Sequence, residues 1–415
     1  MKSLLFLAHR IPYPPNKGDK VRSYHLLEHL AHHYRIHLGT FIDDPRDWEH
    51  AAAVRELCAD ACFAPLPRTR AKALSLRALL TGEPLTLPYF RNTRLHRWVD
   101  ELLASRCTER VLVFSSSMAQ YMDGRLKPSM RSVIDFIDVD SHKWLQFAQN
   151  DSGLPRRIYR REAKELLRYE RSIARRFDAS VFVSAKEAAL FRRLAPECAD
   201  RVSHVDNGVD VGYFSPDAQH ANPYTEGDKA LVFTGAMDYR ANVDAVGWFA
   251  HDVLPLIRVH EPRACLYIVG SRPGRAVRGL AGIPGVRLAA DVPDVRPYIA
   301  HAVAAVAPLR MARGVQNKVL EAMAMGKTVL ATPAALEGID AGAETGVRLA
   351  SAPRSFADEA LALLSRRCPP CATEAARRYV VENHDWGRNL EGFVRLLEGL
   401  PVKGEIDVPR EHLTA

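Results

Sequence analysis

Short apolar runs alternate with amphipathic stretches along most of the chain, and this alternation constrains the fold more than any other feature. Helical patterns such as Val21–His33 and Arg94–Ser105 separate the apolar runs. Strands that alternate with helices form parallel sheets with helices on both faces, so we expect an α/β protein. The strand candidates of the first half are Leu4–Ala8, Ile36–Phe41, Val111–Ser115, Ser132–Asp135, Ala179–Val183 and Val202–Val205.

The alternation pauses once, at Asn207–Asp228, a segment rich in glycine and proline that we interpret as a linker. It restarts with five more strand candidates: Ala230–Thr234, Cys265–Val269, Val286–Leu288, Ala304–Ala307 and Thr328–Ala331. A chain of 415 residues suits two domains of about 200 residues better than one large sheet. We expect two doubly wound, Rossmann-like domains, over residues 1–215 and 216–384.

The composition and the first residues bear on where the protein works. Hydrophobic residues make up 47% of the chain and charged residues 26%, which excludes fibrous and disordered classes. The first apolar run, Leu4–Ala8, is too short for the core of a signal peptide, and no apolar run reaches about 18 residues. We therefore expect a cytoplasmic protein. Its seven scattered cysteines predict no disulfide framework, and we interpret the Cys368–Cys371 pair as reduced loop cysteines.

The net charge of +8 belongs to the first half of the chain. Residues 1–210 carry 34 basic and 26 acidic side chains, a net of +8, which leaves zero for the remainder. Leu154–Phe177 concentrates this charge in one predicted helix with nine basic and three acidic residues, among them Arg156, Arg157, Arg160 and Arg161. The helix is either a solvated surface helix or a contact with an anionic membrane surface.

The strongest local pattern lies at Pro308–Val329 and predicts strand, loop, helix, turn and strand. The helix runs from Gln316 to Met325, and Gly326 ends it in the left-handed conformation. The free amides and the dipole at the start of such a helix suit a diphosphate. Lys318 and Glu321 share a helix face, where a lysine suits phosphate and a carboxylate suits two ribose hydroxyls. The alternative is an ordinary surface pair.

This segment resembles the nucleotide-sugar loop of family 4 glycosyltransferases, which have the two-domain GT-B fold with a cleft between the domains. Leu320–Val329 matches the end of the family motif. The resemblance implies that Glu321 grips the ribose and that Lys318 contacts phosphate. The first glutamate of the motif, which contacts the donor sugar, falls on Arg313, a departure that leaves sugar recognition open. The amides implied for the diphosphate are those of Gly314, Val315, Gln316 and Asn317.

Further segments of the second half are similar to the same family. Val205–Pro216 resembles the signature before the interdomain linker, and Phe233–Asn242 resembles the first strand and glycine loop of the donor domain. The resemblance implies a donor contact at Gly235. Ala236 and Asn242 stand where many members carry cations, and Arg240 is our candidate to replace that charge.

Two more matches complete this half. Ala290–Tyr298 resembles the segment whose backbone holds the base, which places Val292 in the donor site. Asp385–Trp386 is similar to the start of the C-terminal helix that crosses back to the N-terminal domain, so residues 385–415 are assigned to that helix and a tail.

In the first half, Pro12–Arg22 resembles the loop after the first strand of the family, and its single Gly18 is placed near the phosphates. Together with Ser132–Ser141 it resembles an exosortase-associated subgroup thought to serve exopolysaccharide synthesis. Asp138-Val139-Asp140 is also a D-x-D pattern, which we interpret as an acidic loop at a strand end rather than a metal site.

The resemblance to family 4 implies a retaining, hexosyltransferase-like enzyme. It would transfer a sugar from a nucleotide-sugar donor to an exopolysaccharide or lipid-linked glycan at the inner face of the membrane. Lys318, Arg240 and Gly18 are the predicted catalytic groups, and no metal is required because cations and a helix dipole stabilise the leaving diphosphate. A sugar-nucleotide epimerase and a non-catalytic nucleotide-sugar-binding relative stay open as alternatives. No dinucleotide fingerprint or nucleic-acid-binding motif is present, so a dehydrogenase and a nucleic-acid partner are not expected.

Overall fold

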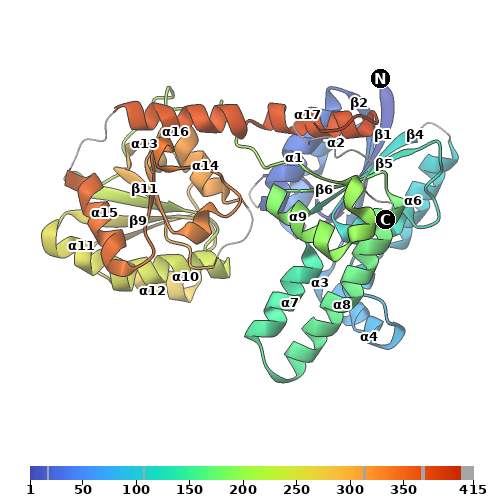
Figure 1. Ribbon diagram of the computed structural model, residues 1–415, viewed down its shortest axis with the longest axis horizontal. Coiled ribbons are helices and arrows are strands. Elements are labelled where there is room, and N and C mark those ends of the chain that lie inside the picture. The colour runs from blue at the N-terminus through green and yellow to red at the C-terminus, as the bar shows by residue number, and fades with distance from the viewer. Residues whose placement is uncertain (16–17, 106–107, 312–314, 366–369, 403–415) are drawn as a thin grey trace, which may run out of the picture. The chain divides into compact units, whose positions relative to one another are not determined.

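A computed structural model describes residues 1–15, 18–105, 108–311, 315–365 and 370–402 (Figure 1). The chain divides into two compact units. Unit 1 comprises residues 1–206 together with the segment from Leu390 onward, and unit 2 comprises Asn207–Asn389. Each unit contains one parallel sheet with helices packed on it, so the predicted α/β class is confirmed.

The sheet of unit 1 has seven strands in the order β3-β2-β1-β4-β5-β6-β7. Every pair is parallel, and the central strands are buried on both faces because helices cover the sheet on both sides. All six strands predicted here are confirmed, and β3 was not predicted. The strands are β1 (Lys2–Ala8), β2 (Tyr34–Ile42), β3 (Asp60–Pro65), β4 (Thr108–Phe114), β5 (Arg131–Ile137), β6 (Ala179–Phe182) and β7 (Val202–His204).

Ten helices belong to the described part of unit 1 up to residue 206 or return to it at the end of the chain. Local capping fixes some of their starts: the Asn92 side chain accepts hydrogen bonds from the first amides of α6, and Ser184 does the same for α9. The helices are α1 (Gly18–Ala31), α2 (Ala51–Glu56), α3 (Arg68–Ser75), α4 (Ala78–Thr81), α5 (Thr86–Tyr89), α6 (Thr93–Ala104), α7 (Asp140–Asn150), α8 (Gly153–Arg176), α9 (Ala185–Leu194) and α17 (Trp386–Leu397).

The sheet of unit 2 has six parallel strands in the order β10-β9-β8-β11-β12-β13. The five predicted strands are confirmed, and the short edge strand β13 was not predicted. In both units the order runs outward on either side of the first strand, so a switch point lies between β1 and β4 and another between β8 and β11. The strands are β8 (Lys229–Thr234), β9 (Ala264–Gly270), β10 (Val286–Ala290), β11 (Ala304–Ala307), β12 (Val329–Ala331) and β13 (Val347–Leu349).

One contiguous core of buried aliphatic and aromatic side chains holds this sheet to its helices, with Phe233, Phe249 and Leu320 fully buried in it. The predicted left-handed end of the helix after β11 is confirmed, with φ of +67° at Gly326. The helices are α10 (Arg240–Trp248), α11 (Leu254–His260), α12 (Arg275–Leu280), α13 (Arg296–His301), α14 (Asn317–Ala324), α15 (Pro353–Ser365) and α16 (Pro370–Asn383).

The segment 207–228 is packed rather than a free linker. The Val209 amide donates to the His384 carbonyl, and the Tyr224 hydroxyl donates to the Tyr298 carbonyl. Because these bonds tie the segment to unit 2, the division falls after Asp206, nine residues before the sequence-based boundary at 215/216. At the other end it falls within α17, between Asn389 and Leu390, rather than at 384/385.

Among the described residues, no helix is both long enough and apolar enough to cross a membrane.

Candidate functional site

The switch point of unit 2 lies where β8 and β11 end side by side. Beyond β11 the chain passes through residues 312–314, which lie outside the described part, and then enters α14 at Asn317. Gln316, the residue before α14, has an extended backbone. Its side chain does not cap the helix, so it forms no hydrogen bond with the first backbone amides of α14. Ligands of open parallel sheets bind at such switch points, and these amides suit an anion.

Two glycines keep the ends of β8 and β9 close together. Gly235 follows β8 with φ of +151°, a conformation that favours glycine, and its amide donates to the Val269 carbonyl. A Cβ atom on Gly270 would collide with the Gly235 carbonyl oxygen. A Cβ on Gly235 itself would lie 2.8 Å from the side-chain nitrogen Nδ2 of Asn242 and 3.4 Å from Cε of Lys318. Glycine at this position therefore makes room for these two side chains.

Lys318 projects from the first turn of α14 into this space. Its Nζ donates a 2.6 Å hydrogen bond to Oδ1 of Asn242 and lies 4.7 Å from the centre of the Phe233 ring. Asn242 is buried on α10, and its Nδ2 donates to the Ala236 carbonyl at 2.9 Å. The side-chain amide of Asn242 thus bridges the Ala236 carbonyl and the Lys318 ammonium. The Phe233 ring adds a cation–π attraction to the same ammonium.

Glu321 lies one turn further along α14 and is half-buried. Burial raises the pKa of Glu321 to about 7, and the charge of Lys318 opposes this shift. Burial likewise lowers the pKa of Lys318 to about 8, against the charge of Glu321. Lys318 and Glu321 are both half-buried, so neither is a fully exposed surface group. Two half-buried ionisable groups with shifted pKa values at a switch point are typical of a binding site.

The remaining residues predicted for the donor site lie around the same strand ends or outside the described part. Val292 follows β10, where the adjacent Asp291 amide donates to the Gly270 carbonyl, and its half-buried side chain packs on the core. Val315 is half-buried, and Asn317 has a buried Oδ1 without a hydrogen-bond partner among the described residues. Arg313 and Gly314 lie outside the described residues.

Arg240 opens α10 two residues before Asn242, yet its side chain is exposed. No hydrogen bond or ion pair joins it to another described residue. The structure therefore brings Lys318, Asn242, Gly235 and Glu321 together. The side chain of Arg240 is exposed and is not part of this cluster.

Gly18 lies in unit 1, where it begins α1 beyond the end of β1. Nothing within 4 Å would meet a side chain there. The next residue, Asp19, accepts hydrogen bonds from His9 at 3.1 Å and from Arg10 at 2.8 Å. Burial raises the pKa of the Asp19 carboxyl, but these contacts outweigh it and hold that pKa well below the ordinary range. At the start of α1, the Asp19 carboxylate is thus paired with Arg10, and no other group of the described residues lies close to the neighbouring Gly18.

Lys143, on α7, forms ion pairs with both aspartates of the D-x-D pattern. Nζ of Lys143 lies 2.7 Å from a carboxylate oxygen of Asp138 and 3.1 Å from one of Asp140. Both acidic groups therefore have a cationic partner, which agrees with the interpretation of an acidic strand-end loop.

The basic helix is α8, which packs along α7 as a helical hairpin (Figure 1). Arg156, Arg157 and Arg160 are exposed near the tip of this hairpin. Arg161 differs, because its guanidinium donates to the Ala78 and Glu83 carbonyls and so fastens α8 to the segment around α4. Arg161 therefore does not belong with the exposed arginines of the hairpin tip.

Comparison with known proteins follows this division of the chain. A family model described as "Glycosyl transferases group 1" matches residues 228–366, which lie within unit 2 and include Gly235, Asn242, Lys318 and Glu321. No curated protein matches the chain.

Solved structures are similar over nearly the whole chain. Sucrose-phosphate synthase from Thermosynechococcus elongatus has 16% identity and a TM-score of 0.72, over 96% of this chain and 99% of that one. WaaG, a glycosyltransferase involved in lipopolysaccharide biosynthesis, has 16% identity and a TM-score of 0.64, over 95% and 100%. Anabaena HepE in complex with UDP and glucose has 12% identity and a TM-score of 0.63, over 96% and 100%.

These likenesses establish the architecture. The chain has the GT-B fold, two α/β units with parallel sheets, and its second unit contains a segment similar to the group 1 glycosyl transferases.

One member of the cluster, Asn242, was not among the predicted site residues. The sequence does show it, at the position where relatives of the resembled family carry a cation. Its contact with Lys318, 76 residues away, depends on how β8 and β11 pair.

Proposed function

We propose that the protein is a glycosyltransferase that uses a nucleotide-sugar donor and transfers the sugar with retention of configuration. Unit 2 binds the nucleoside diphosphate, and unit 1 supplies the acceptor side. The observation that carries the proposal is the cluster at the start of α14, where Asn242 accepts a hydrogen bond from Lys318 beside the half-buried Glu321.

Each group of the cluster suits one part of a nucleoside diphosphate. The amides of Gln316 and Asn317 and the ammonium of Lys318 suit the diphosphate, since helix starts and cations bind anions. The carboxylate of Glu321 suits the two ribose hydroxyls, which would donate hydrogen bonds to a half-buried acceptor. The backbone around Val292 suits the base. UDP is the first nucleotide to test, because it is bound in structurally similar HepE.

Retention needs no dedicated base. As the bond between the anomeric carbon and the diphosphate breaks, the acceptor oxygen forms its new bond on the same face. The departing phosphate oxygen takes the proton of the acceptor hydroxyl. The protein then has to stabilise the developing charge of the diphosphate, which preorganised donors such as Lys318 and the amides of α14 do well. In this proposal Arg240 and the loop at Gly18 contribute further positive potential, and Arg313 takes part in contacts with the sugar.

The acceptor is proposed to be an exopolysaccharide intermediate or another lipid-linked glycan, met at an anionic membrane. The tip of the α7–α8 hairpin supports this, because it combines exposed apolar and basic side chains. Leu145, Phe147 and Leu154 are 40%, 51% and 69% exposed, and Arg156, Arg157 and Arg160 are exposed on the same hairpin. Apolar groups beside exposed arginines are typical of helices that lie in a membrane interface.

A thermal-shift screen across UDP-, GDP- and ADP-sugars tests the proposal, followed by transfer assays with the donor that stabilises the protein. A donor at about 100 times its dissociation constant adds roughly 2.7 kcal/mol to the stability of the unit that binds it. Replacement of Glu321 by alanine should remove a charged hydrogen bond to ribose, worth about 1.5–3 kcal/mol, and abolish most of this shift.

Replacement of the exposed Glu374 on α16 by alanine is the matched control and should leave the shift unchanged. Donor binding without transfer or donor hydrolysis would instead show a non-catalytic nucleotide-sugar-binding protein. No stabilisation by any nucleotide sugar would refute the donor site itself.

A further inference from the structure

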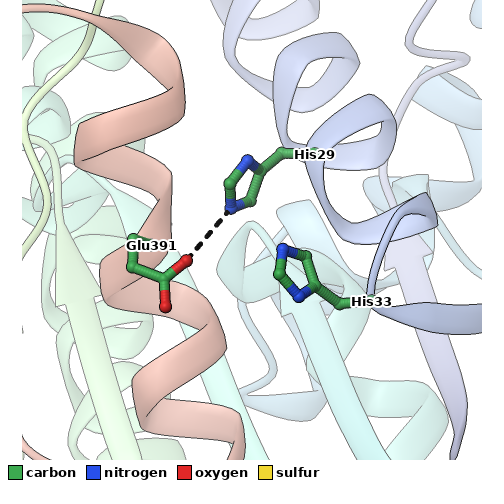
Figure 2. A group of neighbouring side chains, drawn as sticks. All are labelled: His29, His33 and Glu391. Atoms are coloured by element: carbon green, nitrogen blue, oxygen red, sulfur yellow. Dashed lines mark ion pairs between the residues drawn. The ribbon is translucent and has the colours of Figure 1, made fainter. Parts of the chain in front are cut away.

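Two histidines and a glutamate converge on one face of unit 1, away from the groups described above (Figure 2). His29 lies in the last turn of α1, His33 follows just beyond its end, and Glu391 lies on α17. Nε2 of His29 and Oε2 of Glu391 are 3.8 Å apart, and the two imidazole rings are 5.1 Å apart between centres. One ligand atom from each of the three residues lies within 4.8 Å of the other two.

The chemistry of this set suits a transition metal better than a hard cation. Imidazole nitrogen is the commonest protein ligand for Zn²⁺, and a carboxylate oxygen is a frequent companion. Zn²⁺ bonds to nitrogen and oxygen at about 2.0–2.2 Å, so its ligand atoms stand somewhat closer together than these do. His33 and Glu391 are exposed, and rotation of their side chains can close the difference.

We propose that His29, His33 and Glu391 bind a divalent transition-metal ion, with Zn²⁺ as the reference ion and water in the remaining position. The ion joins α17 to α1 and thereby stabilises unit 1. This site is independent of the proposed sugar transfer, whose groups lie at other strand and helix ends.

The position of Glu391 gives the ion a structural role. Leu390 is the first residue of α17 assigned to unit 1, so Glu391 stands where the chain returns to this unit. Further along, Glu398 is held by Arg110 at 2.8 Å and by Lys2 at 2.6 Å, which fastens the far end of the helix. A metal at Glu391 fastens the near end. Because its ligands are brought together only in the folded chain, binding the ion stabilises the folded state.

Calorimetric titration of chelator-treated, tag-free full-length protein with ZnCl₂ tests the proposal. We expect saturable binding and a higher Tm with Zn²⁺ present. Glu391→Gln and His33→Gln should each weaken binding at least about ten-fold, since even the outer partners of metal ligands are worth that much. Binding should weaken on acidification because protons compete for imidazole.

His32→Gln is the matched control. His32 is exposed and adjacent to His33 but is not a member of the group, so its replacement should leave affinity unchanged. The variants change exposed side chains, and circular dichroism verifies that they fold. Equal losses in His32→Gln would mean diffuse binding to a histidine-rich surface and would overturn the site. Full affinity in Glu391→Gln would overturn the link to α17, and absence of binding to the parent protein would overturn both.

Discussion

The protonation of Lys318 should respond to an anion bound beside it, because burial lowers the pKa of Lys318 to about 8. The negative charge of a diphosphate favours the ammonium form and therefore raises this pKa. At pH 8, where the free site is only partly protonated, UDP binding should take up protons. Uridine, which has no phosphate, should not cause this uptake.

Calorimetry at pH 8 in buffers of different ionisation enthalpy measures the uptake. Lys318→Met should abolish the difference between UDP and uridine and should weaken UDP more than uridine. Lys186, exposed on α9, provides the control as Lys186→Met. If Lys318→Met took up as many protons as the parent protein, or weakened both ligands equally, Lys318 would be a structural residue instead.

Glu170 gives a second prediction at this scale, concerning stability. It is fully buried on α8 and accepts hydrogen bonds from the amide and hydroxyl of Ser141. Burial, with the nearby charge of Asp140, raises the pKa of Glu170 to about 8, while the bonds from Ser141 act in the opposite direction. A carboxyl with a raised folded-state pKa stabilises the fold below its ordinary pKa, and this stability is lost as the pH rises through 8.

Glu170→Gln should therefore flatten the loss of stability between about pH 5 and pH 8, because glutamine keeps the hydrogen-bonding shape without titrating. Thermal melts of the parent and the variant across this window measure the difference between their transition temperatures. Glu165→Gln, on the same helix but outside this buried contact, is the control. A constant difference at all pH values would contradict the prediction.

The sequence was informative about Lys318 and Glu321 because their spacing of three residues places them on one helix face whatever the tertiary structure. The partners of Lys318 could not be found in this way. Asn242 meets it only because β8 pairs with β11 across the switch point, a contact between distant segments. Nor could the pattern of Asp138 and Asp140 show that Lys143 would lie between them.

At the scale of elements, the predicted strands are confirmed where they are apolar and buried on both faces, as in β1 and β9. The two strands that were missed lie at sheet edges. β3 begins at the exposed Asp60, and β13 has only three residues, of which two are exposed. The apolar signal of β13 is weak because the strand is short and mostly exposed, and pairing with β12 determines it.

The α7–α8 hairpin carries the prediction of this scale. Arg156, Arg157 and Arg160 are exposed beside the apolar tip, whereas Arg161 holds the hairpin to the segment around α4. Replacement of the three exposed arginines by glutamine should lower binding to vesicles with anionic lipid, at about 1 kcal/mol per charge near the surface. Arg161 stays unchanged because its removal would disturb packing.

Co-sedimentation with such vesicles at low salt measures this binding. The control replaces three exposed arginines of unit 2 with the same change in net charge: Arg275, Arg348 and Arg354. Equal losses in both triple variants would indicate a general effect of charge, and no binding by the parent protein would leave α8 as a solvated surface helix.

At the scale of the whole molecule, the two units share one sheet topology, but the family match lies only in unit 2. Both sheets run outward from their first strand, with a switch point beside it. The match to the group 1 glycosyl transferases covers 228–366 and thus lies within unit 2. The match thus lies in the unit to which we assign donor binding.

The last prediction concerns the reaction as a whole. In the proposed mechanism Lys318 and the amides of α14 stabilise the leaving diphosphate, so turnover needs no metal. Treatment with EDTA should lower the Tm, because it removes the ion from His29, His33 and Glu391, and it should leave the rate of transfer intact well below that Tm. An α-configured donor should give an α-linked product.

NMR of the anomeric proton follows the product, and assays with and without chelator follow the rate. A β-linked product would require attack from the opposite face and hence a separate base, which would replace the proposed proton transfer to the diphosphate. Loss of activity on chelation with rescue by Mn²⁺ would show that a hard cation holds the diphosphate. Persistence of that loss in Glu391→Gln would place the required metal outside the α1–α17 site, because the variant lacks a ligand of that site.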